Sequence, residues 1–170
     1  MAWSSHCGAI QVLGKRAGPT IHGVEYNEHG SQFVSAAEDG MVKVWWVGSD
    51  KPRLAVNVCP SPNSASFSPK GTKIIVACSD GTTRVIDSRS GRELTAMSAA
   101  TAVTVDEAEF SPDGRRILTS FDSSGTGGVR IWNSELATPS LSTLERVALQ
   151  RIKQNVTPGE RRRYLAEISG

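Results

Sequence analysis

The sequence predicts an all-β fold made of three similar antiparallel sheets, and three observations support it. Segments of forty-odd residues repeat the same order of strand, turn and strand. An aromatic residue stands at the same place in each copy, at Tyr26, Phe67 and Phe110, with spacings of 41 and 43 residues. A glycine follows each aromatic residue in the same phase, at Gly30, Gly71 and Gly114.

The turns of each copy have residues suited to hairpins. Ser-Pro-Lys-Gly at 68–71 and Ser-Pro-Asp-Gly at 111–114 place proline second and glycine where a positive φ is useful. Asp-Gly at 39–40 and again at 80–81 is a strong signal for a short hairpin. In the third copy Asp122 comes one residue earlier, and the residues after it predict a small loop insertion before the next strand.

The runs between these turns are rich in β-branched residues, which favours strands. We expect two strong strands in each copy, at 32–36 and 42–45, 73–77 and 83–86, and 116–120 and 129–132. Weaker outer strands are expected at 54–58 and 92–96. A sheet of this kind repeated every forty-odd residues indicates a partial β-propeller of about three four-stranded antiparallel blades. A generic antiparallel sandwich is the alternative, but it would not repeat these residues at a fixed period.

The predicted blades occupy about 24–63, 64–106 and 107–136. Residues 1–23 form an N-terminal segment, in which 9–13 suits the outer strand of a preceding blade. Residues 137–170 are expected to be a linker and a short, basic, helical C-terminal tail. Complete propellers have about four to eight blades, so three fall short. A fragment or truncated product is favoured over two chains that complete one ring.

The repeated pattern resembles the WD-repeat family over residues 24–133. The matching features are the phenylalanine, serine, proline and glycine turns, the turn aspartates and the residues that end the strands. The resemblance implies structural roles for Tyr26, Asp39, Trp45, Phe67, Asp80, Phe110, Asp122 and Trp132. No copy has the Gly-His pair of the family, so its His–Asp–Trp hydrogen-bond network cannot be complete. Trp46 and Asn133 replace the terminal aspartate in two copies.

The C-terminal tail is basic, whereas the rest of the chain is close to neutral. Residues 154–165 are similar to a segment that follows the last blade of many bacterial WD-repeat proteins, which belong to large regulatory chains. That similarity implies the C-terminal portion of a bacterial-type protein. The three arginines at 161–163 could contact nucleic acid, but the near-neutral body makes a solvated helix face the better interpretation.

Candidate chemistry is sparse in this sequence. The three cysteines have no short CxxC spacing, and Cys78 lies in an apolar run where it is expected to be a small buried hydrophobe. The three histidines lack the spacing of a metal site, and we expect no metal or other cofactor. The glycine-rich residues 125–128 lack the phosphate-loop pattern and are expected to be a flexible hairpin tip.

These observations favour a protein-interaction scaffold or sensor module, within a larger regulatory protein, over an enzyme. The expected partner is a protein or peptide, bound by loops at the blade margins. The partner-binding residues we predict are Glu38, Lys51, Arg53, Ser123, Ser124, Gly125 and Thr126. Self-association through open propeller edges is also expected. The alternatives are a truncated remnant, or an enzyme with a site in the propeller channel, where the inner strands begin at Glu25, Ser66 and Glu109, too few polar residues to name a reaction. No apolar run is long enough to span a membrane and no secretory signal is visible, so the expected location is cytoplasmic.

Overall fold

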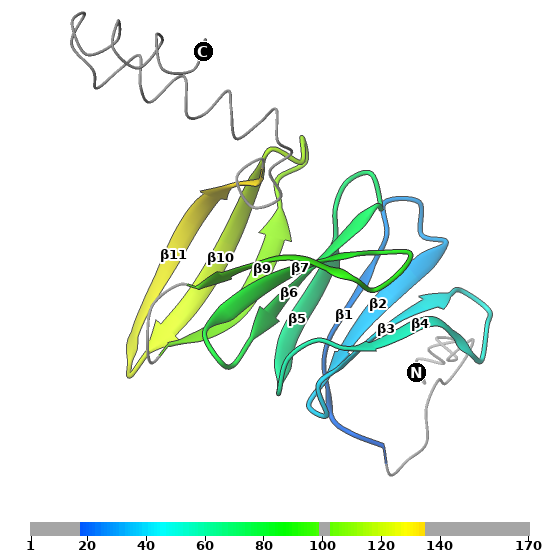
Figure 1. Ribbon diagram of the computed structural model, residues 1–170, viewed down its shortest axis with the longest axis horizontal. Coiled ribbons are helices and arrows are strands. Elements are labelled where there is room, and N and C mark those ends of the chain that lie inside the picture. The colour runs from blue at the N-terminus through cyan, green and yellow to red at the C-terminus, as the bar shows by residue number, and fades with distance from the viewer. Residues whose placement is uncertain (1–17, 99–102, 135–170) are drawn as a thin grey trace, which may run out of the picture.

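The computed structural model describes residues 18–98 and 103–134, which form three antiparallel sheets side by side in an arc (Figure 1). The first sheet contains β1 (Ile21–Tyr26), β2 (Gln32–Ala37), β3 (Met41–Trp46) and β4 (Pro52–Asn57). The second contains β5 (Pro62–Phe67), β6 (Lys73–Cys78), β7 (Thr82–Asp87) and β8 (Glu93–Ser98). The third contains β9 (Thr104–Phe110), β10 (Arg116–Ser123) and β11 (Thr126–Asn133). This is the partial propeller that the repeat predicts.

The three sheets share one strand register. The aromatic anchors pair with the second strand in the same way, as Tyr26↔Phe33, Phe67↔Ile74 and Phe110↔Ile117. The second and third strands then pair as Phe33↔Trp45, Ile74↔Ile86 and Ile117↔Trp132. The three anchors therefore occupy equivalent places. Their exposure differs, because Tyr26 is 63% exposed whereas Phe67 is 8% exposed between two sheets.

The first turn of each sheet is built in the same way. Gly30, Gly71 and Gly114 have φ values of 63°, 65° and 69°, which glycine adopts without steric cost. The residue that opens each turn also accepts a hydrogen bond with its side chain from the residue that starts the next strand. These bonds are Gln32 N–H to Asn27 Oδ1 at 2.9 Å, Lys73 N–H to Ser68 Oγ at 3.1 Å, and Arg116 N–H to Ser111 Oγ at 2.9 Å.

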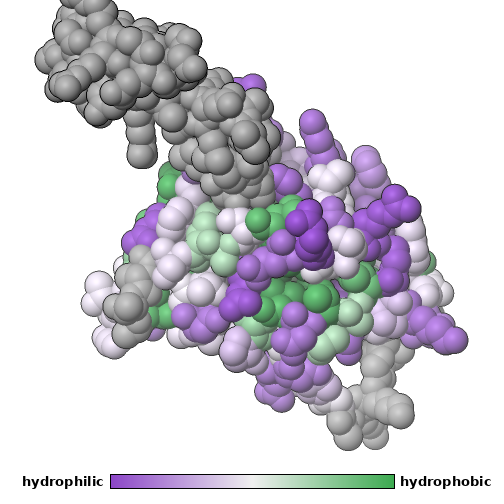
Figure 2. Space-filling model, in the orientation of Figure 1, coloured by the Kyte–Doolittle hydropathy of each residue, from purple (hydrophilic) through white to green (hydrophobic). Residues whose placement is uncertain are grey.

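The core consists of two clusters, one at each junction between sheets. The strand β6 supplies Ile74 and Val76 to the first junction and Ile75 and Ala77 to the second, because successive side chains of a strand point to opposite faces. All four side chains are fully buried. Figure 2 shows hydrophobic residues gathered over the middle of the arc and mainly hydrophilic residues toward its margins. Among the described residues, no helix could cross a membrane.

A disulfide joins the first two sheets. Cys59 follows β4, Cys78 ends β6, and their Cα atoms lie 6.3 Å apart. Both side chains are buried, at 3% and 0% exposure. The sequence correctly indicated a buried Cys78, but it gave no sign of the bond, because the two cysteines are 19 positions apart.

Two of the strand-end tryptophans make equivalent hydrogen bonds within their sheets. The indole N–H of Trp45 donates to Ser35 Oγ at 3.1 Å, and that of Trp132 donates to Thr119 Oγ1 at 3.0 Å. Ser35 and Thr119 occupy matching places on the second strand of each sheet. In the second sheet Ile86 replaces the tryptophan and is buried instead.

The third hairpin differs from the expected loop insertion. The strands β10 and β11 each have eight residues and pair without interruption from Arg116↔Asn133 to Ser123↔Thr126. Only Ser124 and Gly125 form the turn, with φ values of 51° and 89°. The extra residues thus lengthen the hairpin rather than form a loop. Gly128 fits because a Cβ there would lie 2.5 Å from the Phe121 ring. The expected helical tail lies outside the described residues.

Replacement of both Cys59 and Cys78 by alanine is expected to lower the free energy of unfolding by about 3 kcal/mol, since the bond closes a loop of roughly 20 residues. Urea unfolding of the oxidised protein measures this. Reductant should weaken the wild-type protein by a similar amount and leave the double variant unchanged. Cys7→Ala is the matched control. An equal response of both proteins to reductant would contradict a stabilising bond.

Trp132→Phe is expected to cost about 1–3 kcal/mol, because the buried Thr119 hydroxyl loses its indole donor. Urea unfolding is again the measurement, and Trp46→Phe at an exposed position is the control. Combining Trp132→Phe with Thr119→Val should cost less than the sum of the single changes. Strict additivity would show that the hydrogen bond contributes nothing.

Candidate functional site

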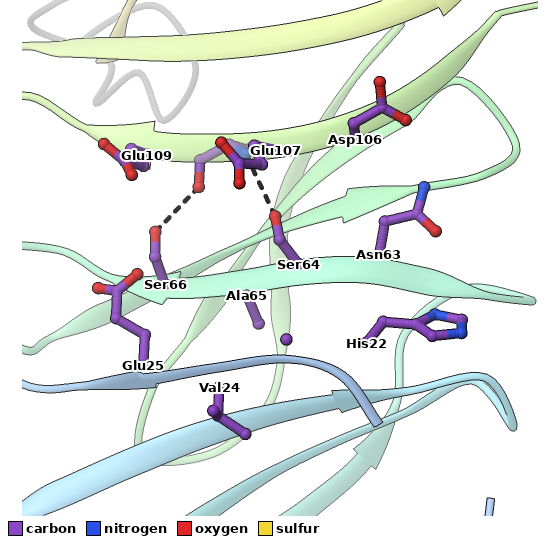
Figure 3. Close-up of a pocket in the computed structure, with 12 residues that line it drawn as sticks. His22, Val24, Glu25, Asn63, Ser64, Ala65, Ser66, Asp106, Glu107 and Glu109 are labelled. Carbon is purple, nitrogen blue, oxygen red and sulfur yellow. Dashed lines mark hydrogen bonds between the residues drawn. The ribbon is translucent and has the colours of Figure 1, made fainter. Parts of the chain in front are cut away.

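The first strands of the three sheets, β1, β5 and β9, line one groove of about 330 Å³ (Figure 3). The backbones approach closely at Gly23, where a Cβ would lie 3.2 Å from the carbonyl oxygen of Asn63. Glycine at this point of β1 therefore lets the first sheet pack against the second at the groove floor.

Hydrogen bonds join these inner strands across the sheet junctions. His22 Nδ1 lies 3.1 Å from the carbonyl oxygen of Pro62, and Asn63 Nδ2 donates to the carbonyl oxygen of Val105 at 2.8 Å. His22 and Asn63 hold equivalent positions in successive sheets, so the contact repeats with a different side chain. At the second junction Ser66 Oγ also donates to the carbonyl oxygen of Ala108 at 3.0 Å. These bonds fix the spacing of the groove walls.

The groove is acidic. Its lining includes Glu25 from β1 and Asp106, Glu107 and Glu109 from β9, and no lysine or arginine. Figure 3 shows Glu25 and Glu109 on opposite walls with Ser66 between them. Partial burial raises the pKa of Glu25 above its ordinary value, and the negative charge of Glu109 raises it further. The backbone N–H of Phe67 donates to Glu25 and offsets part of this rise.

This arrangement is suited to binding a positively charged group. Carboxylates accept strong hydrogen bonds from ammonium and guanidinium groups, and neighbouring hydroxyl and amide groups add further polar contacts. The Ser66 hydroxyl donates to a backbone carbonyl rather than to a carboxylate, so it is not paired with a base. Within residues 18–98 and 103–134, no group of three or more potential ligands could hold a metal ion.

The residues expected to bind partners lie away from this groove and do not form one site. Glu38 is exposed in the turn between β2 and β3, and residues 123–126 form the matching end of the third sheet. Lys51 is exposed in the turn between β3 and β4, at the opposite end of the first sheet. Arg53 is half-buried in β4, where its Nη2 donates to the carbonyl oxygen of Ser88 at 2.9 Å. Arg53 thus contacts the neighbouring sheet.

The turn aspartates divide into two kinds. Asp39 and Asp80 accept hydrogen bonds at 3.0 Å from the backbone N–H two residues later, at Met41 and Thr82. Asp122 lies within β10 and accepts from Gly125 N–H at 3.2 Å, because the hairpin is longer there.

The structure brings together Glu25, Ser66 and Glu109, the three inner-strand residues that the sequence singled out for a channel site. Sequence reasoning did not select Asp106 and Glu107. The signal was present, because Asp106 and Glu107 stand within four residues of the anchor Phe110, and all three acidic residues belong to the inner strand β9. An inner strand of a propeller faces the channel, so three carboxylates in such a strand indicate an acidic wall.

Comparison with known families gives one match. The model of the WD domain, G-beta repeat, matches residues 9–45, 57–87 and 92–133, which together are more than half of the chain. Comparison with curated proteins gave no match. WD40 repeats generally mediate protein–protein interactions and are typically non-catalytic modules. The repeated register, the matching turns and the family match together show that this chain belongs to the WD40 repeat family.

Proposed function

We propose that this chain is a protein-interaction module that binds a basic segment of a protein or peptide in the groove between β1, β5 and β9. The observation that carries the proposal is the acidic lining, with carboxylates on two facing walls and no lysine or arginine. A groove of about 330 Å³ suits a few side chains of a peptide.

Electrostatics supports a cationic occupant. Glu25 is partly removed from water and faces the like charge of Glu109, and both effects raise its pKa. A lysine or arginine side chain between the two carboxylates would replace this repulsion by attraction and would hydrogen-bond to both. Ordering of the groove walls by the inner-strand hydrogen bonds lowers the cost of binding, because the site is already formed.

The exposed turns extend this role to a second surface. Glu38 and the Ser123–Thr126 turn lie at the same end of equivalent hairpins, so a partner larger than the groove could contact both. We expect these turns to add specificity, as polar positions on rigid sheets. Lys51 belongs to a separate surface. Arg53 has a structural role through Ser88.

The wider setting follows from the same proposal. We expect the chain to act within a larger regulatory protein and to associate through the open ends of its arc. The cytoplasmic location expected from the sequence remains a prediction, and the buried disulfide bears on it, because disulfides are rare in reducing compartments.

An enzyme with a channel site is the second candidate, since Glu25, Ser66 and Glu109 line one groove. The hydrogen bond from Ser66 to a carbonyl oxygen makes it the weaker one. Turnover abolished by Glu109→Ala would favour it. A truncated remnant without function would show neither turnover nor binding.

Glu109→Gln is expected to lower the pKa of Glu25 toward its ordinary value without restoring it fully, because burial remains. Carboxyl NMR titration measures this pKa. Glu107→Gln is the matched control, since it removes an equal charge from the groove. A Glu25 titration that Glu109→Gln leaves unchanged would contradict the pairing.

The raised pKa of Glu25 also determines how the stability of the protein changes with pH. Because the charged carboxylate is disfavoured in the folded state, Glu25 opposes folding at neutral pH. This opposition disappears as the pH falls through the raised pKa and the group is protonated. Glu25→Gln should therefore stabilise the protein at pH 7 and should lose this advantage below the pKa, as measured by urea unfolding at several pH values.

An arginine-rich hexapeptide is the probe for the groove. Combined replacement of Glu25 and Glu109 by glutamine should weaken its binding by at least about 10-fold, or about 1.4 kcal/mol. Glu38→Gln, at the margin, should have little effect. Affinity should decline as the pH falls through the pKa of Glu25. Titration calorimetry measures both, and an acidic hexapeptide is the control. If Glu38→Gln and the groove variant lost equal peptide affinity, the assignment of the binding site to the groove would be contradicted.

A further inference from the structure

We propose that two copies of this chain dock head to tail through the end faces of the arc and close a ring of six sheets. The leading face is the exposed side of the first sheet, with Ile21, Val24, Tyr26, Phe33 and Trp45. The trailing face is the exposed side of the third sheet, with Leu118, Ser120, Val129 and Ile131. The proposal rests on the interaction role above but uses none of the groove carboxylates for its apolar contact.

Apolar side chains dominate the leading face in the described part of the chain. Val24 and Tyr26 are 66% and 63% exposed. An aromatic ladder crosses the face, with ring centroids of Tyr26 and Phe33 6.1 Å apart and those of Phe33 and Trp45 6.0 Å apart. Aromatic groups of this size are usually buried against another element.

The trailing face is aliphatic. Leu118, Val129 and Ile131 are 44%, 66% and 64% exposed, although all three belong to regular strands. Leu118 pairs with Ile131, and Ser120 pairs with Val129, so the four residues form a compact square on one side of the sheet. Hydrophobic residues also show at the β11 margin of the molecule in Figure 2. Contiguous exposed apolar surface of this kind marks an interaction site.

The internal junctions show what each leading-face position does when a neighbour is present. In the third sheet the five equivalent residues all pack in the second core cluster, and they are Val105, Ala108, Phe110, Ile117 and Trp132. In the second sheet four of the equivalents pack in the first cluster, and they are Ala65, Phe67, Ile74 and Ile86. The leading face is therefore the half of a sheet junction that an earlier sheet covers.

The trailing face corresponds to the other half of a sheet junction. Its equivalents in the first sheet are Val34, Ala36, Val42 and Val44, and all four pack in the first core cluster. Its equivalents in the second sheet are Ile75, Ala77, Thr83 and Val85, and all four are buried. The described part of one chain thus exposes both halves of the junction that it makes twice internally. A second copy supplies the missing half at each end.

A polar contact at the junction is also available at the new interface. At the first internal junction the backbone N–H of Phe67 donates to the carboxylate of Glu25. Glu109 is the equivalent of Glu25, and Tyr26 is the equivalent of Phe67. In the head-to-tail arrangement Glu109 would accept a hydrogen bond from the backbone N–H of Tyr26 of the partner subunit.

The number of sheets favours closure with two copies. The described residues of two copies give six sheets, within the four to eight of known propellers, whereas those of three copies give nine. A head-to-tail interface that closes leaves no apolar end face exposed, whereas one that does not close gives filaments. The six-sheet ring therefore covers both apolar end faces of both copies.

Solution mass of the full, oxidised chain tests the proposal by light scattering. The wild-type chain should have twice the 18.2 kDa mass of one chain. Ile131→Glu, on the trailing face, and Val24→Lys, on the leading face, should each give folded 18.2 kDa particles whose circular dichroism spectrum remains that of the wild-type chain. An equimolar mixture of the two variants should return to twice this mass, because one interface is intact and the other pairs glutamate with lysine.

Val47→Glu, an exposed turn position in the first sheet, is the matched control and should remain a dimer. A wild-type mass of 18.2 kDa at all concentrations would overturn the proposal. So would a dimer that survives either face variant, a mixture that stays monomeric, or a mass that climbs steadily with concentration. The single groove variant Glu25→Gln, which leaves the interfacial Glu109 intact, should stay dimeric while its peptide binding weakens, so failure of one proposal leaves the other measurable.

Discussion

The structure depends on a single constraint: an apolar face of a sheet is removed from water only by contact with a neighbouring sheet. The second sheet has such contact on both faces, because β6 sends alternate side chains into both core clusters. The first and third sheets have it on one side only. Strands that are buried on both faces are near-continuous apolar runs, and Lys73–Cys78 has this character whereas β1 and β11 do not. The difference between the middle and end sheets is therefore already visible in their composition.

Equivalent positions in the three sheets carry different side chains, which have different roles. Ser66 uses its hydroxyl to join the second sheet to the third, whereas Glu25 and Glu109 place carboxylates in the groove. A similar exchange occurs at the strand ends, where Trp45 and Trp132 make an indole hydrogen bond and Ile86 makes only apolar contact. Repeats can diverge in this way because the shared backbone register, rather than a shared side chain, keeps the sheets alike.

Much of this fold could be predicted from the sequence, because the relevant signals are local. The Asp-Gly and Ser-Pro-x-Gly turns and the β-branched runs located most strands to within about two residues. The extended third hairpin was missed, since Gly127 and Gly128 indicate a loop until the ring of Phe121 is seen to occupy the space above Gly128. The disulfide was missed because it depends on how two sheets pack.

The groove could be predicted from the sequence only in part. Glu25, Ser66 and Glu109 could be proposed as neighbours from repeat phase alone, and they do line one groove. Asp106 and Glu107 needed the inner position of β9 to become meaningful. The predicted partner-binding residues Glu38 and Ser123–Thr126 lie at one end of the sheets and Lys51 at the other, an arrangement that depends on the strand topology.

The position of the Cys59–Cys78 bond has a mechanical consequence. It encloses the whole β5–β6 hairpin, including the exposed turn at Lys70, so a trypsin-like cut after Lys70 would leave the two fragments covalently attached. The fragment with the first sheet and β5 would be released from the fragment that begins before β6 only after reduction. The bond therefore acts as a tether that makes the first junction tolerant of backbone cleavage, whereas the second junction depends on packing and hydrogen bonds across it.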